Sequence, residues 1–221
     1  LSLAFAALVW GFSFIVIKDA FSVFPPSCFV ALRFGLAAAI LAAVCRRRLR
    51  RTTRQEIAGG CAMGIFQGTG NLLQAMGLSL SYAGSVAFIS STPVVLIPLI
   101  FWLWKRRFPG LRTLFTALLC LSGVALLTLG DGEFRFRTGD LFTMGAAICF
   151  AFNFILMERH VNRPGNDALV LTIFQCAAAG LIGLAVSIVG GEVPTLDGMK
   201  GFAGLAYAVI FVGALLAATT G

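Results

Sequence analysis

Residues 6–15 read AALVWGFSFI, and residues 146–155, which lie 140 positions later, read AAICFAFNFI. Five of these positions are identical, and Trp10 and Ser13 correspond to Phe150 and Asn153. The same offset aligns residues 34–41 with residues 174–181, including a phenylalanine and a run of three alanines. A constant offset over two separate stretches predicts an internal repeat.

The composition places both copies of this repeat in a membrane. The chain has 221 residues, of which 59% are hydrophobic and 12% are charged, and its mean hydropathy is +0.95. Ordinary soluble domains carry about 25% charged residues. So few charges exclude a soluble globule, and so much hydrophobicity excludes intrinsic disorder. We therefore expect an all-α polytopic membrane protein.

The length accommodates about eight membrane spans, at roughly 20 apolar residues for each. Apolar segments are found at residues 2–17, 27–45, 57–80, 84–104, 111–130, 140–157, 168–190 and 201–221. Under the repeat, the first segment corresponds to the sixth and the second to the seventh, so the repeat unit has five helices. A unit with an odd number of spans reverses its orientation at each copy, which predicts an inverted repeat of the kind found in secondary transporters. We expect one repeat at residues 1–130 and an incomplete second repeat at 139–221.

The basic residues predict the orientation. Twelve of the 17 Lys and Arg residues fall in three alternating loops: Arg46, Arg47, Arg48, Arg50, Arg51, Arg54, Lys105, Arg106, Arg107, Arg112, Arg159 and Arg163. Loops rich in Lys and Arg remain in the cytoplasm. These loops and the N-terminus are therefore expected to be cytoplasmic, in a multi-pass protein of a cell membrane, with the bacterial inner membrane favoured. Because the net charge of +8 is explained by orientation, no nucleic-acid partner is expected.

The candidate chemistry contains no metal centre or cofactor site. The six cysteines are widely spaced within apolar runs, and the chain has one histidine, so neither a metal-type spacing nor a disulfide framework is present. All nine carboxylates lie in loops or at the ends of spans. No catalytic residue, metal ligand or cofactor is predicted, and the chain is not expected to be an enzyme.

Several motifs resemble the EamA family of the drug/metabolite transporter superfamily. The resemblance extends over nearly the whole chain and rests on these sequences: Trp10-Gly11-Phe12-Ser13-Phe14, Arg33-Phe34, Ser90-Ser91-Thr92-Pro93-Val94, Gly123-Val124 and Gly139-Asp140. It implies ten helices in a five-plus-five frame, both termini in the cytoplasm, and transport of small metabolites. It also implies that the chain stops after the eighth helix. One departure is Lys105-Arg106, which stands where the family commonly has Gly-Glu.

The segment at 57–80 carries the clearest polar stripe. Gln67, Asn71 and Gln74 share one helical face, and it overlaps a stripe of small residues at Gly60, Gly64 and Gly68. The opposite side carries Ile65, Leu72, Leu73 and Met76, which suit lipid. Glycines spaced by four allow a neighbouring helix to approach closely. Amides are unfavourable against lipid, so they are expected to line a cavity or to hydrogen-bond between helices; both interpretations are kept.

Other candidates lie on neighbouring spans. Trp10 with Ser13, and Phe150 with Asn153, each place an aromatic ring beside a hydrogen-bonding group, which suits a small amphipathic solute. Pro93 and Pro98 are expected to interrupt a helix, as a kink, a hinge or part of the site. Arg33 is the single charge well inside a span, with a gating, substrate-binding or structural role.

These observations favour a permease that moves a small solute, such as an amino acid or a nucleoside, by alternating access, with export as the expected direction. Its partners would be the solute and the lipid bilayer, and association of two copies is left open. The alternatives are a membrane-embedded lipid-modifying enzyme and a non-transporting membrane subunit. The sequence offers little nucleophile, acid–base or metal chemistry for the enzyme.

Overall fold

The computed structural model describes residues 25–106, 110–128 and 136–191, and every regular element in these ranges is an α-helix. The helices are α2 (Pro26–Val44), α3 (Arg46–Leu49), α4 (Arg54–Leu80), α5 (Ala83–Ser91), α6 (Pro93–Lys105), α7 (Leu111–Thr128), α8 (Thr138–Val161) and α9 (Ala168–Val189). The spans expected between residues 27 and 190 are confirmed as helical. Their ends differ from the expected ends by at most four residues. The spans expected at 2–17 and 201–221 lie outside the described residues.

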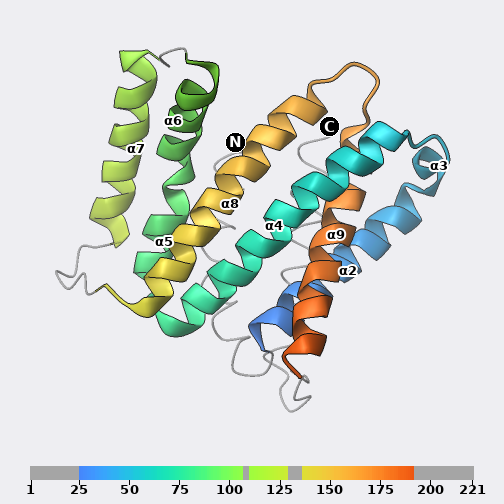
Figure 1. The fold of residues 1–221 in the computed structure, drawn as a ribbon, viewed down its shortest axis with the longest axis horizontal. Helices are drawn as coiled ribbons and strands as arrows, with labels where there is room; N and C mark the ends of the chain where they lie inside the picture. The colour runs from blue at the N-terminus through green and yellow to red at the C-terminus, as the bar shows by residue number, and fades with distance from the viewer. Residues whose placement is uncertain (1–24, 107–109, 129–135, 192–221) are drawn as a thin grey trace.

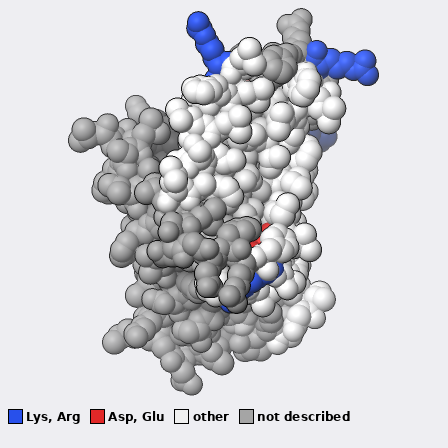
Figure 2. Space-filling model, turned by 90° about the vertical axis from the view of Figure 1, so that its left-hand side faces the viewer, with Lys and Arg blue, Asp and Glu red and all other residues white. Residues whose placement is uncertain are grey.

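Four stretches of described helix are long and apolar enough to cross a membrane. They are Pro26–Val44, Ala83–Leu103, Thr138–Val161 and Ala168–Val189, and the second of them combines α5 with most of α6. On the face shown in Figure 2, a broad uncharged surface separates the basic side chains at one end from a small group of charged side chains lower down. The protein is therefore an all-helical, polytopic membrane protein, as its composition predicted.

The central element is α4, which packs against α8 on one side and α9 on the other. Beyond α9 lies α2, while α5, α6 and α7 lie beyond α8 (Figure 1). At 27 residues α4 is also the longest described helix. Its glycines and amides make it less apolar than its neighbours, and burial between two helices compensates for this because those residues meet protein rather than lipid.

Glycines allow α4 to approach α9 closely, as their spacing predicted. A Cβ atom at Gly60 would lie 2.7 Å from the carbonyl oxygen of Leu171, and one at Gly64 would lie 2.6 Å from that of Gln175. A Cβ atom at Gly68 would lie 2.8 Å from the Cα atom of Ala179. These contacts are with backbone, which has little room to shift. The small-residue stripe of α4 therefore forms the α4–α9 interface.

The prediction that one side of α4 faces lipid is only partly correct. Ile65 is 53% exposed, but Leu72 is 7% exposed and belongs to a buried cluster with Val30 and Phe34 of α2. Leu72 and Ile65 lie on the same side of α4 at different depths. Because α2 reaches α4 near Leu72, one stretch of the predicted lipid face is covered by protein, which a helical wheel does not reveal.

Candidate functional site

A chain of three side-chain amides connects α9, α8 and α4. Gln175 donates through Nε2 to Oδ1 of Asn153 at 3.2 Å, and Asn153 donates through Nδ2 to Oε1 of Gln67 at 2.7 Å. Asn153 is 4% exposed and stands in the middle of the chain. It thus satisfies its donor and its acceptor with partners from two other helices. Of these residues, Gln67 and Asn153 were predicted to belong to the site.

The other two amides on α4 diverge from this chain. Gln74 donates through Nε2 to the Oγ atom of Ser90 on α5, at 2.8 Å. Asn71 is buried and donates through Nδ2 to the backbone carbonyl of Gln67 in its own helix, also at 2.8 Å. The polar stripe is therefore real as a face of α4, but its members have different partners. Interhelical hydrogen bonding, one of the two interpretations of this stripe, is what Gln67 and Gln74 display.

The aromatic candidate Phe150 packs against α4. A Cβ atom at Gly70 would lie 2.8 Å from Cε1 of Phe150, so the ring occupies the space that this glycine leaves. Close by in the sequence, the rings of Phe66 and Phe152 stack with their centroids 5.5 Å apart. Aromatic rings therefore flank the α4–α8 interface that holds the amide chain. Trp10 and Ser13, the other members of the predicted site, lie outside the described residues.

The predicted interruption in the span at 84–104 lies between α5 and α6. Pro93 has no N–H group, so the carbonyl oxygen of Ile89 loses its usual helical donor. In the structure this oxygen accepts hydrogen bonds from Thr92, through the backbone N–H at 3.1 Å and through Oγ1 at 2.7 Å. Thr92 retains helical dihedral angles, so the segment changes its hydrogen bonding without leaving the span. Pro98 lies inside α6. Ser90, the partner of Gln74, lies directly before this interruption.

Arg33 is placed apart from these groups, on α2. Its guanidinium carbon lies 5.3 Å from the centroid of the Phe34 ring. The helix that α2 mainly packs against is α9, which carries Gln175 of the amide chain. The structure therefore does not bring Arg33 together with the prolines.

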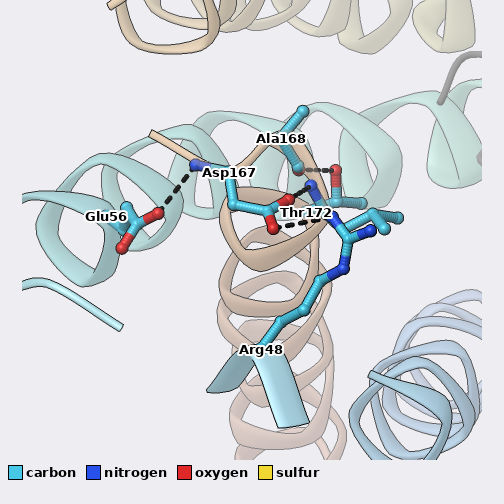
Figure 3. Close-up of polar contacts among 6 residues, drawn as sticks. Arg48, Glu56, Asp167, Ala168 and Thr172 are labelled. Atoms are coloured by element: carbon cyan, nitrogen blue, oxygen red, sulfur yellow. Dashed lines mark hydrogen bonds and ion pairs between the residues drawn. The ribbon is translucent and has the colours of Figure 1, made fainter. Parts of the chain in front are cut away.

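A cluster of charged residues joins three segments at one end of the bundle (Figure 3). Arg48 of α3 donates through Nη1 to Oδ2 of Asp167 at 2.8 Å, and the backbone N–H of Asp167 donates to Oε1 of Glu56 at 2.7 Å. Asp167 also caps α9 by accepting from the N–H of Leu169, and Thr53 caps α4 together with Glu56. Hydrogen-bonded carboxylates thus fix the start of α9 to the start of α4.

The environment of this cluster favours its charged forms. Burial by itself would raise the pKa of Asp167, but hydrogen bonds from Arg48 and from the Leu169 N–H outweigh burial and lower the pKa below its ordinary value. Burial would likewise raise the pKa of Glu56, but bonds from the Asp167 N–H and from Thr53 bring it below the ordinary value. The hydrogen bond to Asp167 raises the pKa of Arg48 in turn.

A second cluster ties α4 to α8 at the opposite end of the bundle. Asp140 is fully buried at the start of α8, where it accepts from the Ser81 hydroxyl at 2.6 Å and from the Arg137 N–H at 2.8 Å. The side chain of Arg137 turns outward to the Tyr82 hydroxyl. A buried carboxylate therefore holds each end of α4 against a neighbouring helix, and the amide chain lies between these two ends.

Sequence reasoning missed several residues of this arrangement, among them Gln175 and Asp167. Gln175 was overlooked although it is an amide in the middle of an apolar span, a signal that could have identified it. Asp167 is expected from the sequence only in a loop or at the end of a span, because nothing local indicates that it meets Arg48 and Glu56. Within the described ranges, no group of three or more His, Cys, Asp or Glu residues is placed to hold a metal ion. The described part of the candidate site consists of the amides on α4, α8 and α9 and the Phe150 ring beside them.

Comparison with known proteins shows that the chain is similar to transporters. The model of the EamA-like transporter family matches residues 1–129. The chain is 31% identical over 170 residues to an uncharacterized transporter of Archaeoglobus fulgidus, in an alignment covering 77% of this chain and 52% of the relative. It is 26% identical over 183 residues to the uncharacterized transporter YvbV of Bacillus subtilis, covering 78% and 59%. The chain thus spans somewhat more than half the length of these relatives.

Proposed function

Because the chain belongs to the EamA-like transporter family, we propose that it is an integral-membrane permease that exports a small amphipathic metabolite, such as an amino acid or a nucleoside, by alternating access. The observation that carries this proposal is the part-buried amide chain Gln175–Asn153–Gln67, which connects three helices between the two ends of α4. Polar side chains are unfavourable inside a bilayer, so those that occur in a membrane-spanning helix commonly mark a solute pathway.

The proposed solute exchanges hydrogen bonds with these amides. An amide has both donors and an acceptor, so it can pair with another amide or with a polar solute at similar free energy. Without solute, Asn153 and Gln67 satisfy each other; with solute, each turns to the solute's polar groups. The rings of Phe150 and Trp10 would cover the apolar part of the solute. Such exchange leaves no buried polar group unpaired in either state.

The proposed movement uses the interruption between α5 and α6. A helix whose hydrogen-bond ladder is broken at Pro93 bends there more easily than an intact helix. Ser90 lies beside the interruption and accepts from Gln74 of α4. Bending at Thr92 and Pro93 would therefore alter a contact with the helix that carries the amides. This linkage lets access to the site change from one membrane side to the other.

Reconstitution of the full-length protein in liposomes tests the proposal. We expect labelled amino acids or nucleosides to cross the membrane at rates above those of protein-free liposomes, and preloaded cells that express the protein to lose the solute faster. The Asn153→Ala variant should weaken apparent affinity by about 2-fold to tenfold, which corresponds to the loss of one uncharged hydrogen bond. Trp10→Ala should weaken it more, because a large contact surface is also lost.

Ser79→Ala is the matched control on α4. Ser79 is exposed and donates to the Met76 carbonyl of its own helix, so its removal should leave transport unchanged. Solute flux equal to that of protein-free liposomes across the whole panel would contradict the permease. If both Asn153→Ala and Trp10→Ala keep their affinity and their flux, the solute must bind in another part of the protein.

A further inference from the structure

Arg33 is a charge within a membrane-spanning helix. It lies seven residues after Pro26, which begins α2, and so about 10 Å along the helix at 1.5 Å per residue. Neither α2 nor α9, the helix against which α2 mainly packs, contains an aspartate or a glutamate. Ionisable side chains inside a bilayer normally face a counter-charge or a polar cavity. Among the described helices, α2 and α9 thus supply no counter-charge to Arg33.

The immediate surroundings of Arg33 leave one of its buried donors without a partner among the described residues. Its Nε atom is buried and has no hydrogen-bond partner among the residues that the structure describes. The guanidinium carbon lies 5.3 Å from the centroid of the Phe34 ring, and Cys176 of α9 belongs to the same buried cluster as Phe34. An aromatic face and a thiol offer no strong acceptor to a group that carries five N–H donors in a planar fork.

Arg33 and the amide chain lie at about the same depth along α9. Phe34, the residue after Arg33, packs in one buried cluster with Cys176. Cys176 directly follows Gln175, which donates to Asn153. Consecutive residues of a helix are separated by about 1.5 Å along its axis. A cation and a set of uncharged hydrogen-bonding groups therefore lie beside α9 at a similar level of the membrane.

We propose that Arg33 binds an oxyanion, either a carboxylate or a phosphate, that belongs to a bound molecule and not to the protein. A planar guanidinium matches the two oxygens of such a group and can bind both at once. The oxyanion belongs either to the transported solute or to a lipid headgroup. For a solute, the inference rests on the proposed permease and narrows its substrates to anionic or zwitterionic molecules with a carboxylate or a phosphate.

A carboxylate built into the chain beside Arg33 tests whether the cation lacks a partner. Cys176→Asp introduces one, and Cys176→Asn is the matched uncharged control. With Arg33 present, we expect the aspartate variant to unfold at a temperature at least about 2 °C above that of the asparagine variant. In an Arg33→Gln background the order should reverse, because the aspartate is then buried without a cation. The same order in both backgrounds would overturn the proposal.

Matched probes distinguish the two sources of the oxyanion. Thermal unfolding of the full-length protein in nanodiscs is followed with leucine and with leucinamide, which lacks the carboxylate. It is also compared between phosphatidylglycerol and a phosphate-free glycolipid. Greater stabilisation by leucine assigns the oxyanion to a solute, and greater stability in phosphatidylglycerol assigns it to a headgroup. Either preference should disappear in Arg33→Gln and weaken in Arg33→Lys. If wild type shows neither preference, or if Arg33→Gln retains it, the inference is wrong.

The liposome flux assay separates this failure from failure of the permease. If neutral nucleosides cross the membrane at a rate that does not depend on Arg33, the proposed permease is supported and an oxyanion-bearing solute is excluded. If no solute crosses the membrane but phosphatidylglycerol stabilises the protein through Arg33, the oxyanion site is supported and the permease is contradicted.

Discussion

The side-chain amide of Asn153 donates to the Oε1 atom of Gln67 at 2.7 Å, across 86 positions of sequence. Asn153 lies on α8 and Gln67 on α4, so this bond crosses the interface between two central helices. Because Asn153 also accepts from Gln175 of α9, one buried residue holds three helices in register. The bond is thus a structural contact in the observed state and, in the proposed mechanism, a contact that the solute replaces.

Asn153→Ala should lower the stability of the protein as well as its affinity for solute. The change leaves Oε1 of Gln67 and Nε2 of Gln175 without their partner, and we expect a loss of about 1–3 kcal/mol in the free energy of unfolding. Asn71→Ala is the comparison, since Asn71 bonds only to its own helix. Denaturation in detergent micelles measures both. Equal losses would show that the interhelical amides do not contribute more than a local one.

Gly64→Ala should destabilise the α4–α9 interface. The new Cβ atom would lie 2.5 Å from that of Ala178 and 2.6 Å from the Gln175 carbonyl oxygen, and overpacking of this kind typically costs about 1–3 kcal/mol. Gly64→Leu should be worse. Gly123→Ala on α7 is the control, because a Cβ there meets no atom within 4 Å. Thermal unfolding compares the variants; a Gly64 variant as stable as the Gly123 variant would contradict the close approach.

Leu72→Ala should be strongly destabilising, contrary to what its place on the predicted lipid face indicates. Leu72 is buried against α2, and removal of a buried leucine side chain costs about 2–5 kcal/mol. Ile65→Ala, on the same side of α4 but 53% exposed, should change stability by less than about 1 kcal/mol in micelles. The difference between their unfolding temperatures measures how completely α2 covers α4 near Leu72.

Asp167→Asn should remove a stabilisation that depends on pH. Asparagine caps a helix about as well as aspartate, so the change mainly removes the charge that pairs with Arg48. Because the pKa of Asp167 is lowered in the folded state, its contribution is present above the unfolded pKa of about 3.9 and is lost as pH falls through the folded pKa. The difference in unfolding temperature between wild type and variant should be constant from pH 7 to about pH 5 and shrink below about pH 4. A difference that grows on acidification would reverse this sign.

Single cysteines should label from opposite sides of the membrane. Gln55 and Thr138 are exposed at opposite ends of the bundle, and the basic loops predict that Gln55 is cytoplasmic. In a variant that lacks the native cysteines, Gln55→Cys should resist an impermeant maleimide in intact cells, whereas Thr138→Cys should react. The reverse pattern would invert the topology.

The helices and the close-packing face of α4 could be predicted from the sequence because both depend on local order. Apolar runs and their proline and glycine breaks predicted the helices between residues 27 and 190, and the spacing of Gly60, Gly64 and Gly68 predicted a face that another helix approaches. A helix forms its hydrogen bonds within one segment, and its side chains repeat every 3.6 residues. Its limits and faces can therefore be inferred without knowledge of its neighbours.

The partners of those faces were decided by the tertiary structure. Nothing near Leu72 in the sequence indicates that α2 covers it, and nothing near Asp167 indicates that it meets Arg48, 119 positions away. The amides of α4 were predicted to share a face, yet Gln67 turns to Asn153, Gln74 to Ser90 and Asn71 to its own backbone. Each choice depends on which helix lies opposite at that depth. That is set by the packing of whole helices against one another, where backbones approach closely at small residues and each buried polar group must find a donor or an acceptor.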